Sequence, residues 1–166
     1  TNTANFPLFL LSLSQKNNLP FEYDRLICSD LDISLGRENI DSFGAKISSL
    51  VGIQNIDLLG GLANFESSDI VVLNDVLEHF DDEDSFRALN HVWAKTKGML
   101  LVHVPIEEIP ERKYGHKTSF SRDKLKEWAN ELPSAINITS QFDDIIMQCD
   151  DQSNRDGFLC LVREER

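Results

Sequence analysis

Residues 69–105 read DIVVLNDVLEHFDDEDSFRALNHVWAKTKGMLLVHVP and contain two continuous apolar runs, at 69–73 and 99–104. Short runs of this kind, rich in β-branched residues, are typical of strands buried on both faces of a parallel sheet. Between them, four carboxylates from Asp81 to Asp84 precede apolar residues at helical spacing, where they suit the positive end of a helix dipole. The stretch therefore predicts a strand, a helix that ends near Gly98, and a second strand.

The same alternation of short apolar runs and longer amphipathic runs continues on both sides of this unit. Residues 6–16 read as a helix, and a strand over 6–13 is the alternative. The other expected elements are a strand at 25–33, a helix at 37–51 ended by Gly52, a strand at 53–59, a helix at 121–131 capped by Ser121, strands at 136–139, 142–149 and 158–162, and a hairpin-like turn at 153–157.

These elements predict a single α/β domain over residues 1–166. We expect a Rossmann-like, doubly wound and mostly parallel sheet, with helices on both faces and a C-terminal antiparallel hairpin. The charged segment from Ile106 to Thr118 is too long for an ordinary connection, so it is a candidate functional loop.

The composition narrows the class of partner. The 166 residues include 28 acidic and 16 basic ones, giving a formal net charge of -12. Phosphate backbones and anionic lipid surfaces attract clustered Lys and Arg, so nucleic acid is an unfavoured partner and no membrane association is expected. The three cysteines, Cys28, Cys149 and Cys160, lie far apart in or beside apolar runs, which is typical of reduced thiols and favours a cytoplasmic setting.

Several common kinds of site find no support in the sequence. The four histidines, His79, His91, His103 and His116, are at least twelve residues apart and no cysteines have C-x-x-C spacing, so no metal site is predicted. Neither a G-x-S-x-G nucleophile elbow nor a Walker-type loop occurs. Trp93 and Trp128 occupy apolar helical positions and are expected in the core.

The central stretch resembles class I S-adenosylmethionine-dependent methyltransferases, of the type 11/12-like group. The features that carry the resemblance are Asp69 at the strand start, the Val76-Leu77-Glu78-His79 turn, the acidic helix start, and Val104-Pro105 at the end of the next strand. Tyr114-Gly115-His116 followed by Phe120-Ser121 is similar to a further segment of that family. The resemblance spans about residues 22–131.

This resemblance implies S-adenosylmethionine as cofactor and assigns residues to it. Asp32, with Asp30 as its neighbouring alternative, matches the carboxylate that binds the cofactor's ribose hydroxyls at the end of the second strand. Asn74 and Asp75 match the strand end beside the methyl-donor part. Leu62 and Ala63 match the position that contacts the adenine.

The glycine-rich loop of that family has no counterpart here, because the chain contains no G-x-G, and Leu62 stands where an acidic residue is usual. Three explanations stay open: the first strand and its glycines precede Thr1, another segment replaces them, or the domain has lost catalysis. The same acidic strand end also occurs in nicotinamide-dependent oxidoreductases, but these need G-x-G-x-x-G as well.

Two functions therefore follow from the sequence. The first is methyl transfer to a small-molecule or end-group acceptor, with His116 or His79 as base or orienting group and the 106–118 loop closing over the acceptor. The second is an inactive methyltransferase-like domain that serves as a partner or scaffold, as a homo-oligomer or with another protein. Each candidate also has a purely structural interpretation: Glu78 and His79 as turn residues, His103 as a core histidine, and His116 as a solvent-facing loop residue.

Overall fold

The computed structural model describes residues 26–30, 38, 51–60, 66–142 and 156–164. The chain divides into two compact units, Thr1–Asp57 and Leu58–Arg166. No helix among the described residues is long and apolar enough to cross a membrane.

In the first unit, β1 (Leu26–Asp30) pairs in parallel with β2 (Val51–Asn55), and Leu26 lies opposite Val51. The strand predicted at 25–33 is therefore confirmed over residues 26–30, and the rest of the predicted range lies outside the described residues. Gly52 does not end a helix, as predicted, because it is the second residue of β2 and pairs with Ile27. The predicted helix over 6–16 lies outside the described residues, as does the predicted helix over 37–51 except for Glu38, which is helical, and Val51.

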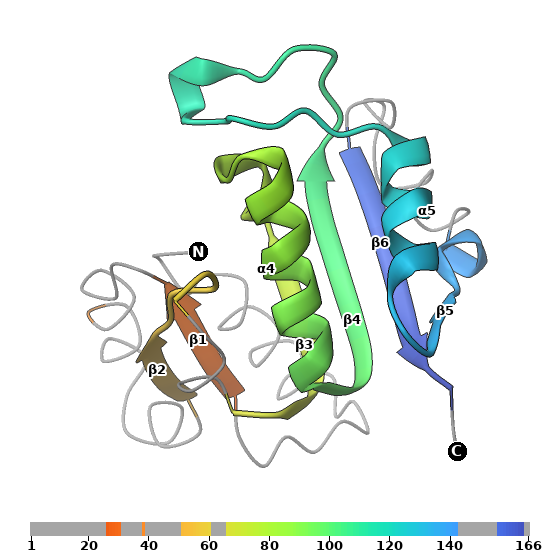
Figure 1. Ribbon diagram of the computed structural model, residues 1–166. Coiled ribbons are helices and arrows are strands. Elements are labelled where there is room, and N and C mark those ends of the chain that lie inside the picture. The colour runs from red at the N-terminus through yellow and green to blue at the C-terminus, as the bar shows by residue number, and fades with distance from the viewer. Residues whose placement is uncertain (1–25, 31–37, 39–50, 61–65, 143–155, 165–166) are drawn as a thin grey trace, which may run out of the picture. The chain divides into compact units, whose positions relative to one another are not determined.

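The larger unit contains a four-stranded sheet with the order β3-β4-β6-β5 (Figure 1). Its strands are β3 (Ser68–Asn74), β4 (Thr96–Pro105), β5 (Ala135–Asn137) and β6 (Asp156–Arg163). β3 and β4 are parallel, whereas β6 is antiparallel to both β4 and β5. The carboxyl ends of β3 and β4 therefore meet the amino end of β6 at one edge of the sheet.

Helices α4 (Asp82–Lys95) and α5 (Arg122–Glu131) contribute to one core with the sheet. α4 begins with Asp82, Glu83 and Asp84 and buries Ala88, Leu89, Val92 and Trp93, which follow the predicted helical spacing. The Ser121 hydroxyl accepts a hydrogen bond of 3.1 Å from the Lys124 amide, so the predicted cap of α5 is confirmed. Trp93 and Trp128 are both buried in this core, as predicted.

One face of β3 faces this core and the other does not. Val71 and Leu73 are buried, whereas Ile70 is 56% exposed and Val72 is 40% exposed. The prediction that this strand is buried on both faces is therefore wrong. The apolar residues of α4 and α5 belong to the same core cluster as Val71 and Leu73. Since alternate residues of a strand point to opposite faces, Ile70 and Val72 point away from this cluster.

α4 ends three residues before Gly98, because Thr96 is already extended and opens β4. The pairing of Ser68 with Thr96 and of Ile70 with Met99 leaves an extra residue in β4. Gly98 lies in this irregular segment, where an added Cβ would lie 2.9 Å from the Asp69 carbonyl oxygen. A glycine is therefore required by the close approach of the two backbones.

The predicted α/β class is confirmed, with a more mixed sheet than expected. The described strands form two parallel and two antiparallel pairings, because β6 enters between β4 and β5. The predicted turn at 153–157 is wrong at its end, since Asp156 and Gly157 already belong to β6. Of the strand predicted at 142–149, Phe142 lies in the 3-10 helix η4 (Thr139–Phe142) and the rest lies outside the described residues.

Candidate active site

The residues assigned to the cofactor by sequence fall in separate parts of the chain. Asp30 is the last residue of β1. Asn74 is the last residue of β3 and Asp75 follows it directly. Asp32, Leu62 and Ala63 lie outside the described residues.

Asp75 is held at the carboxyl end of β3 by its neighbours. Its φ of 52° is left-handed, and its amide donates a 3.1 Å hydrogen bond to the His103 carbonyl. The Asn74 side-chain amide donates to the Asp75 carboxylate over 2.8 Å. The backbone therefore turns sharply where the strand ends and leaves the carboxylate half-exposed at the sheet edge.

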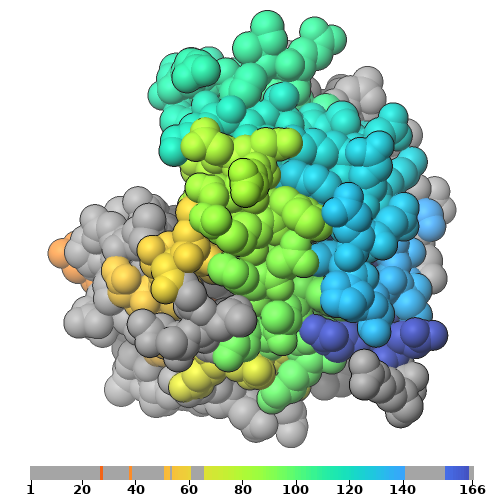
Figure 2. Space-filling model, in the orientation of Figure 1, coloured from red at the N-terminus to blue at the C-terminus, as the bar shows by residue number. Residues whose placement is uncertain are grey.

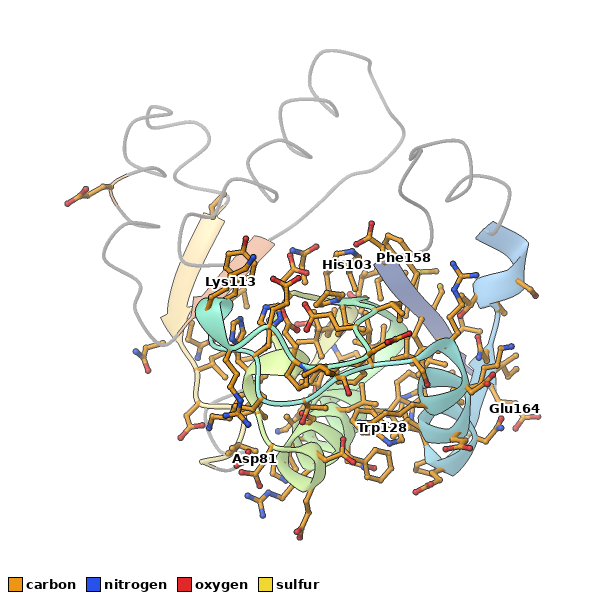
Figure 3. The ribbon with its side chains drawn as sticks, turned by 90° about the horizontal axis from the view of Figure 1, so that it is seen from above. Asp81, His103, Lys113, Trp128, Phe158 and Glu164 are labelled. Carbon is orange, nitrogen blue, oxygen red and sulfur yellow. The ribbon has the colours of Figure 1, made fainter. Side chains whose placement is uncertain are left out.

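The His103 ring lies between two carboxylates at this edge. Its Nδ1 is 2.8 Å from an Asp75 oxygen, and its Nε2 is 3.3 Å from an Asp156 oxygen at the start of β6. The Phe158 ring lies against it, with the ring centres 4.7 Å apart, and Figure 3 shows the two labelled side chains together. Tertiary structure thus joins four residues: His103 from β4, Asp156 and Phe158 from β6, and Asp75 at the end of β3.

The charges of this group reinforce one another. The Asp75 carboxylate, followed by that of Asp156, raises the pKa of His103 against the opposing effect of burial. The neighbouring His103 side chain in turn lowers the pKa of Asp75. The arrangement therefore favours an imidazolium between two carboxylates, which is a poor proton acceptor while it stays charged.

A second group lies on the turn that follows, in the 3-10 helix η2 (Leu77–His79). The Glu78 side chain is 1% exposed, and neither of its carboxylate oxygens has a hydrogen-bond partner among the described residues. Burial raises the pKa of Glu78, because the charged form loses its hydration. The His79 Nε2 lies 3.7 Å from a Glu78 oxygen, which is too far for a hydrogen bond.

The predicted functional loop, Ile106 to Thr118, returns over this turn and contains the 3-10 helix η3 (Arg112–Tyr114). The amides of Lys117 and Thr118 donate to the Glu78 carbonyl, over 2.7 and 3.2 Å. Figures 1 and 2 show the loop projecting beyond the start of α4 at the end of the larger unit. The backbone hydrogen bonds therefore fix the end of the loop on η2.

His116 is brought into this group by the same loop. Its Nδ1 lies 3.0 and 3.1 Å from the two oxygens of Glu107, near the other end of the loop. Its ring centre lies 5.3 Å from that of His79 and 5.8 Å from that of Tyr114. The two histidines proposed from the sequence, 37 positions apart in numbering, are therefore neighbours in space.

Sequence reasoning missed three members of these groups. His103 reads as a core histidine because it lies within an apolar strand, yet it is only partly buried and contacts two carboxylates. Glu107 and Asp156 carry no motif. Their positions in the sequence could have indicated them, because each of the three residues lies at or near the end of a strand. Polar side chains of functional sites gather at strand ends in α/β folds.

No family model matches the chain, and no curated protein matches it. Solved structures do match its fold. Magnesium protoporphyrin IX methyltransferase from Synechocystis with bound SAM matches with a TM-score of 0.59 at 13% identity, over 84% of this chain and 60% of that protein.

An O-methyltransferase family protein from Burkholderia thailandensis matches with a TM-score of 0.66 at 14% identity, over 98% of this chain and 49% of that protein. A protein described as a pericyclic reaction enzyme matches with a TM-score of 0.60 at 11% identity, over 98% of this chain and 42% of that protein. The chain thus spans roughly half the length of these proteins, and it shares their Rossmann-like fold.

Proposed function

We propose that this protein, which has the fold of S-adenosylmethionine-dependent methyltransferases, transfers a methyl group from that cofactor to a small-molecule or end-group acceptor. The observation that carries the proposal is the match of 84% of the chain to a methyltransferase solved with SAM bound. Because a fold supports more than one chemistry, the polar groups at the strand ends supply the second argument.

Two described residues support the proposed place of the methyl-donor end of the cofactor. Asn74 and Asp75 lie at the carboxyl end of β3, where ligands of open α/β sheets bind. The half-exposed Asp75 carboxylate suits the positive charges of the sulfonium and the amino group. We assign the ribose to Asp32 or Asp30 and the adenine to Leu62 and Ala63 on the family resemblance.

The cofactor supplies a methyl group that is already activated by a positively charged sulfur. The acceptor's lone pair forms the new bond to the methyl carbon while the carbon–sulfur bond breaks toward sulfur. The protein has then to align the acceptor, exclude water, and accept a proton if the acceptor carries one. The 106–118 loop is the proposed cover, because its end is fixed on η2 beside both histidines.

His116 is the proposed proton acceptor and His79 its neighbour on the acceptor side. The Glu107 carboxylate accepts from Nδ1 of His116, so that in the neutral ring the lone pair is on Nε2 and points in a fixed direction. His103 is a weaker candidate for this role, since the carboxylates beside it favour its protonated form. A small polar acceptor is proposed over nucleic acid because of the net charge of -12. A cytoplasmic location is proposed from the cysteine pattern.

The first test is a calorimetric titration of S-adenosylhomocysteine into the protein in the presence of EDTA, with NADH as the control ligand. We expect micromolar or tighter binding of the first alone. Asp32→Ala should weaken it by about 1–3 kcal/mol through loss of the ribose hydrogen bonds, whereas Asp123→Ala, an exposed acid in α5, should leave it unchanged. Absence of binding by the folded protein would favour the alternative, a partner or scaffold domain.

A second test addresses the acceptor side. His116→Ala should lower turnover and leave the affinity for S-adenosylhomocysteine nearly intact, because the proposed role belongs to the acceptor. Equal loss of both would remove His116 from that role. His91→Gln is the matched control, since its Nδ1 donates to the Leu58 carbonyl within the fold.

A further inference from the structure

The turn η2 and the 106–118 loop bring together one buried carboxylate and two imidazoles. Glu78, His79 and His116 can each offer one ligand atom, and these atoms all lie within 4.8 Å of one another. We propose that these three residues bind a divalent metal ion of the first transition series. Such ions form bonds of about 2.0–2.2 Å to N and O ligands, which places the ligand atoms roughly 3–4 Å apart, so small side-chain movements suffice.

The burial of the Glu78 carboxylate without a hydrogen-bond partner among the described residues indicates that a positively charged partner is missing. A carboxylate that is 1% exposed and has no hydrogen-bond partner among the described residues is a costly group to bury. Its backbone carbonyl is already occupied by the amides of Lys117 and Thr118, so the side chain is not needed to hold the loop. A cation beside the carboxylate would offset its lost hydration.

The two imidazoles are oriented as metal ligands are. A carbonyl oxygen can only accept, so Nδ1 of His79 donates to the Gly115 carbonyl over 3.3 Å. Nδ1 of His116 donates to the Glu107 carboxylate over 3.0 Å. In the neutral form of each ring, Nε2 is then the unprotonated nitrogen that can bind an ion. Histidine ligands in metal sites are fixed in this way by a carbonyl or carboxylate on the other nitrogen, so Glu107 and Gly115 are positioning groups.

The set of donors selects the class of ion. Two neutral imidazoles with one carboxylate suit Zn²⁺, Mn²⁺ or Fe²⁺, whereas Mg²⁺ and Ca²⁺ prefer oxygen ligands throughout. Three protein ligands also leave coordination positions open for water or another molecule. Since the His79 side chain is exposed, the open coordination positions would face solvent on the His79 side of the ion.

Metal binding does not depend on the proposed methyl transfer, but it would change the role of His116 in that reaction. With an ion bound, Nε2 of His116 coordinates the metal and no longer accepts a proton. The metal-bound form would then orient the acceptor by coordination, and the metal-free form by hydrogen bonding. Measuring metal binding without cofactor or acceptor, and cofactor binding in EDTA, lets either proposal fail alone.

The test begins with EDTA-treated, dialysed protein at pH 7.5, titrated calorimetrically with ZnCl₂, MnCl₂ and MgCl₂ in separate experiments. We expect one ion per chain, with Zn²⁺ or Mn²⁺ bound more tightly than Mg²⁺. In a parallel NMR titration, paramagnetic Mn²⁺ should broaden the ring signals of His79 and His116 first and leave those of His91 last. Absence of binding of all three ions at millimolar concentration would overturn the proposal.

Variants locate the ion. Glu78→Gln and His116→Gln should each weaken binding by at least about 10–100-fold, and Glu107→Ala by a comparable factor through loss of orientation. His91→Gln should bind as the unsubstituted protein does. Unchanged affinity in both Glu78→Gln and His116→Gln would place the ion elsewhere and overturn the assignment. If these variants fail to fold by circular dichroism, the order of Mn²⁺ broadening in the unsubstituted protein decides alone.

Discussion

The Nδ1 atom of His103 lies 2.8 Å from an Asp75 carboxylate oxygen, and the Asp75 amide donates to the His103 carbonyl over 3.1 Å. The two residues are therefore linked through both backbone and side chains at the carboxyl ends of β3 and β4. The ionisation of each residue therefore depends on that of the other.

Asp75→Asn should lower the pKa of His103. The carboxylate of Asp75 is the main cause of the raised value, and an amide carries no charge to favour the imidazolium. The measurement is an NMR titration of the His103 ring signals. Asp84→Asn is the control, because Asp84 forms its ion pair with Arg87 on α4. A His103 pKa that is the same in both variants would contradict the assigned cause.

The stability contributed by His103 should depend on pH with a definite sign. Because its folded pKa is raised from 6.5, the protonated ring stabilises the fold below that value, and the contribution is lost as the pH rises through the folded pKa. Asp75, whose pKa is lowered from 3.8, loses its contribution as the pH falls through its own folded value.

Urea unfolding of the unsubstituted protein and of His103→Gln at a series of pH values checks this sign. The free-energy difference should be largest between about pH 4 and 6, and should reach only about 1 kcal/mol, since the Asp75 carboxylate is half-exposed and screened by solvent. A difference that grows above pH 8 would show that the ring acts in its neutral form.

Glu78→Met should stabilise the metal-free protein at neutral pH. Its pKa is raised from 4.5, so the cost of the carboxylate to the fold grows as the pH rises above that value and is complete above the folded pKa. Methionine fills a similar volume without a charge. We expect a gain of about 1–3 kcal/mol at pH 7 in EDTA, shrinking toward pH 4, by urea unfolding. Glu127→Met, an exposed position in α5, should change stability by less than about 0.5 kcal/mol. A clear loss of stability in the Glu78 variant would mean that the carboxylate has a stabilising partner.

Gly98→Ala should destabilise the larger unit. The new Cβ would lie 2.9 Å from the Asp69 carbonyl oxygen, and a backbone atom cannot move aside as a side-chain end can. Thermal and urea unfolding should show a loss of about 1–3 kcal/mol. The neighbouring exposed Lys97→Ala serves as control; equal stability of the two variants would mean that β3 and β4 separate at little cost.

Much of the larger unit follows from local patterns. The alternation of apolar runs with an acidic helix start predicts β3, α4 and β4, because burial periodicity and the helix dipole act within a few residues. The cap at Ser121 is similarly local. The exact start of β4 does not follow from local patterns, because Thr96 belongs to the sheet through its pairing with Ser68 on β3.

The amino-acid pattern is enough to predict the α/β class, the order of elements in 68–131 and the choice of His79 and His116 as candidate groups. It does not predict that these two rings lie beside the buried Glu78, or that His103 lies between Asp75 and Asp156. These contacts arise on folding, because they join side chains from different elements. Their distances depend on strand register and on the path of the 106–118 loop, which spacing along the chain does not contain.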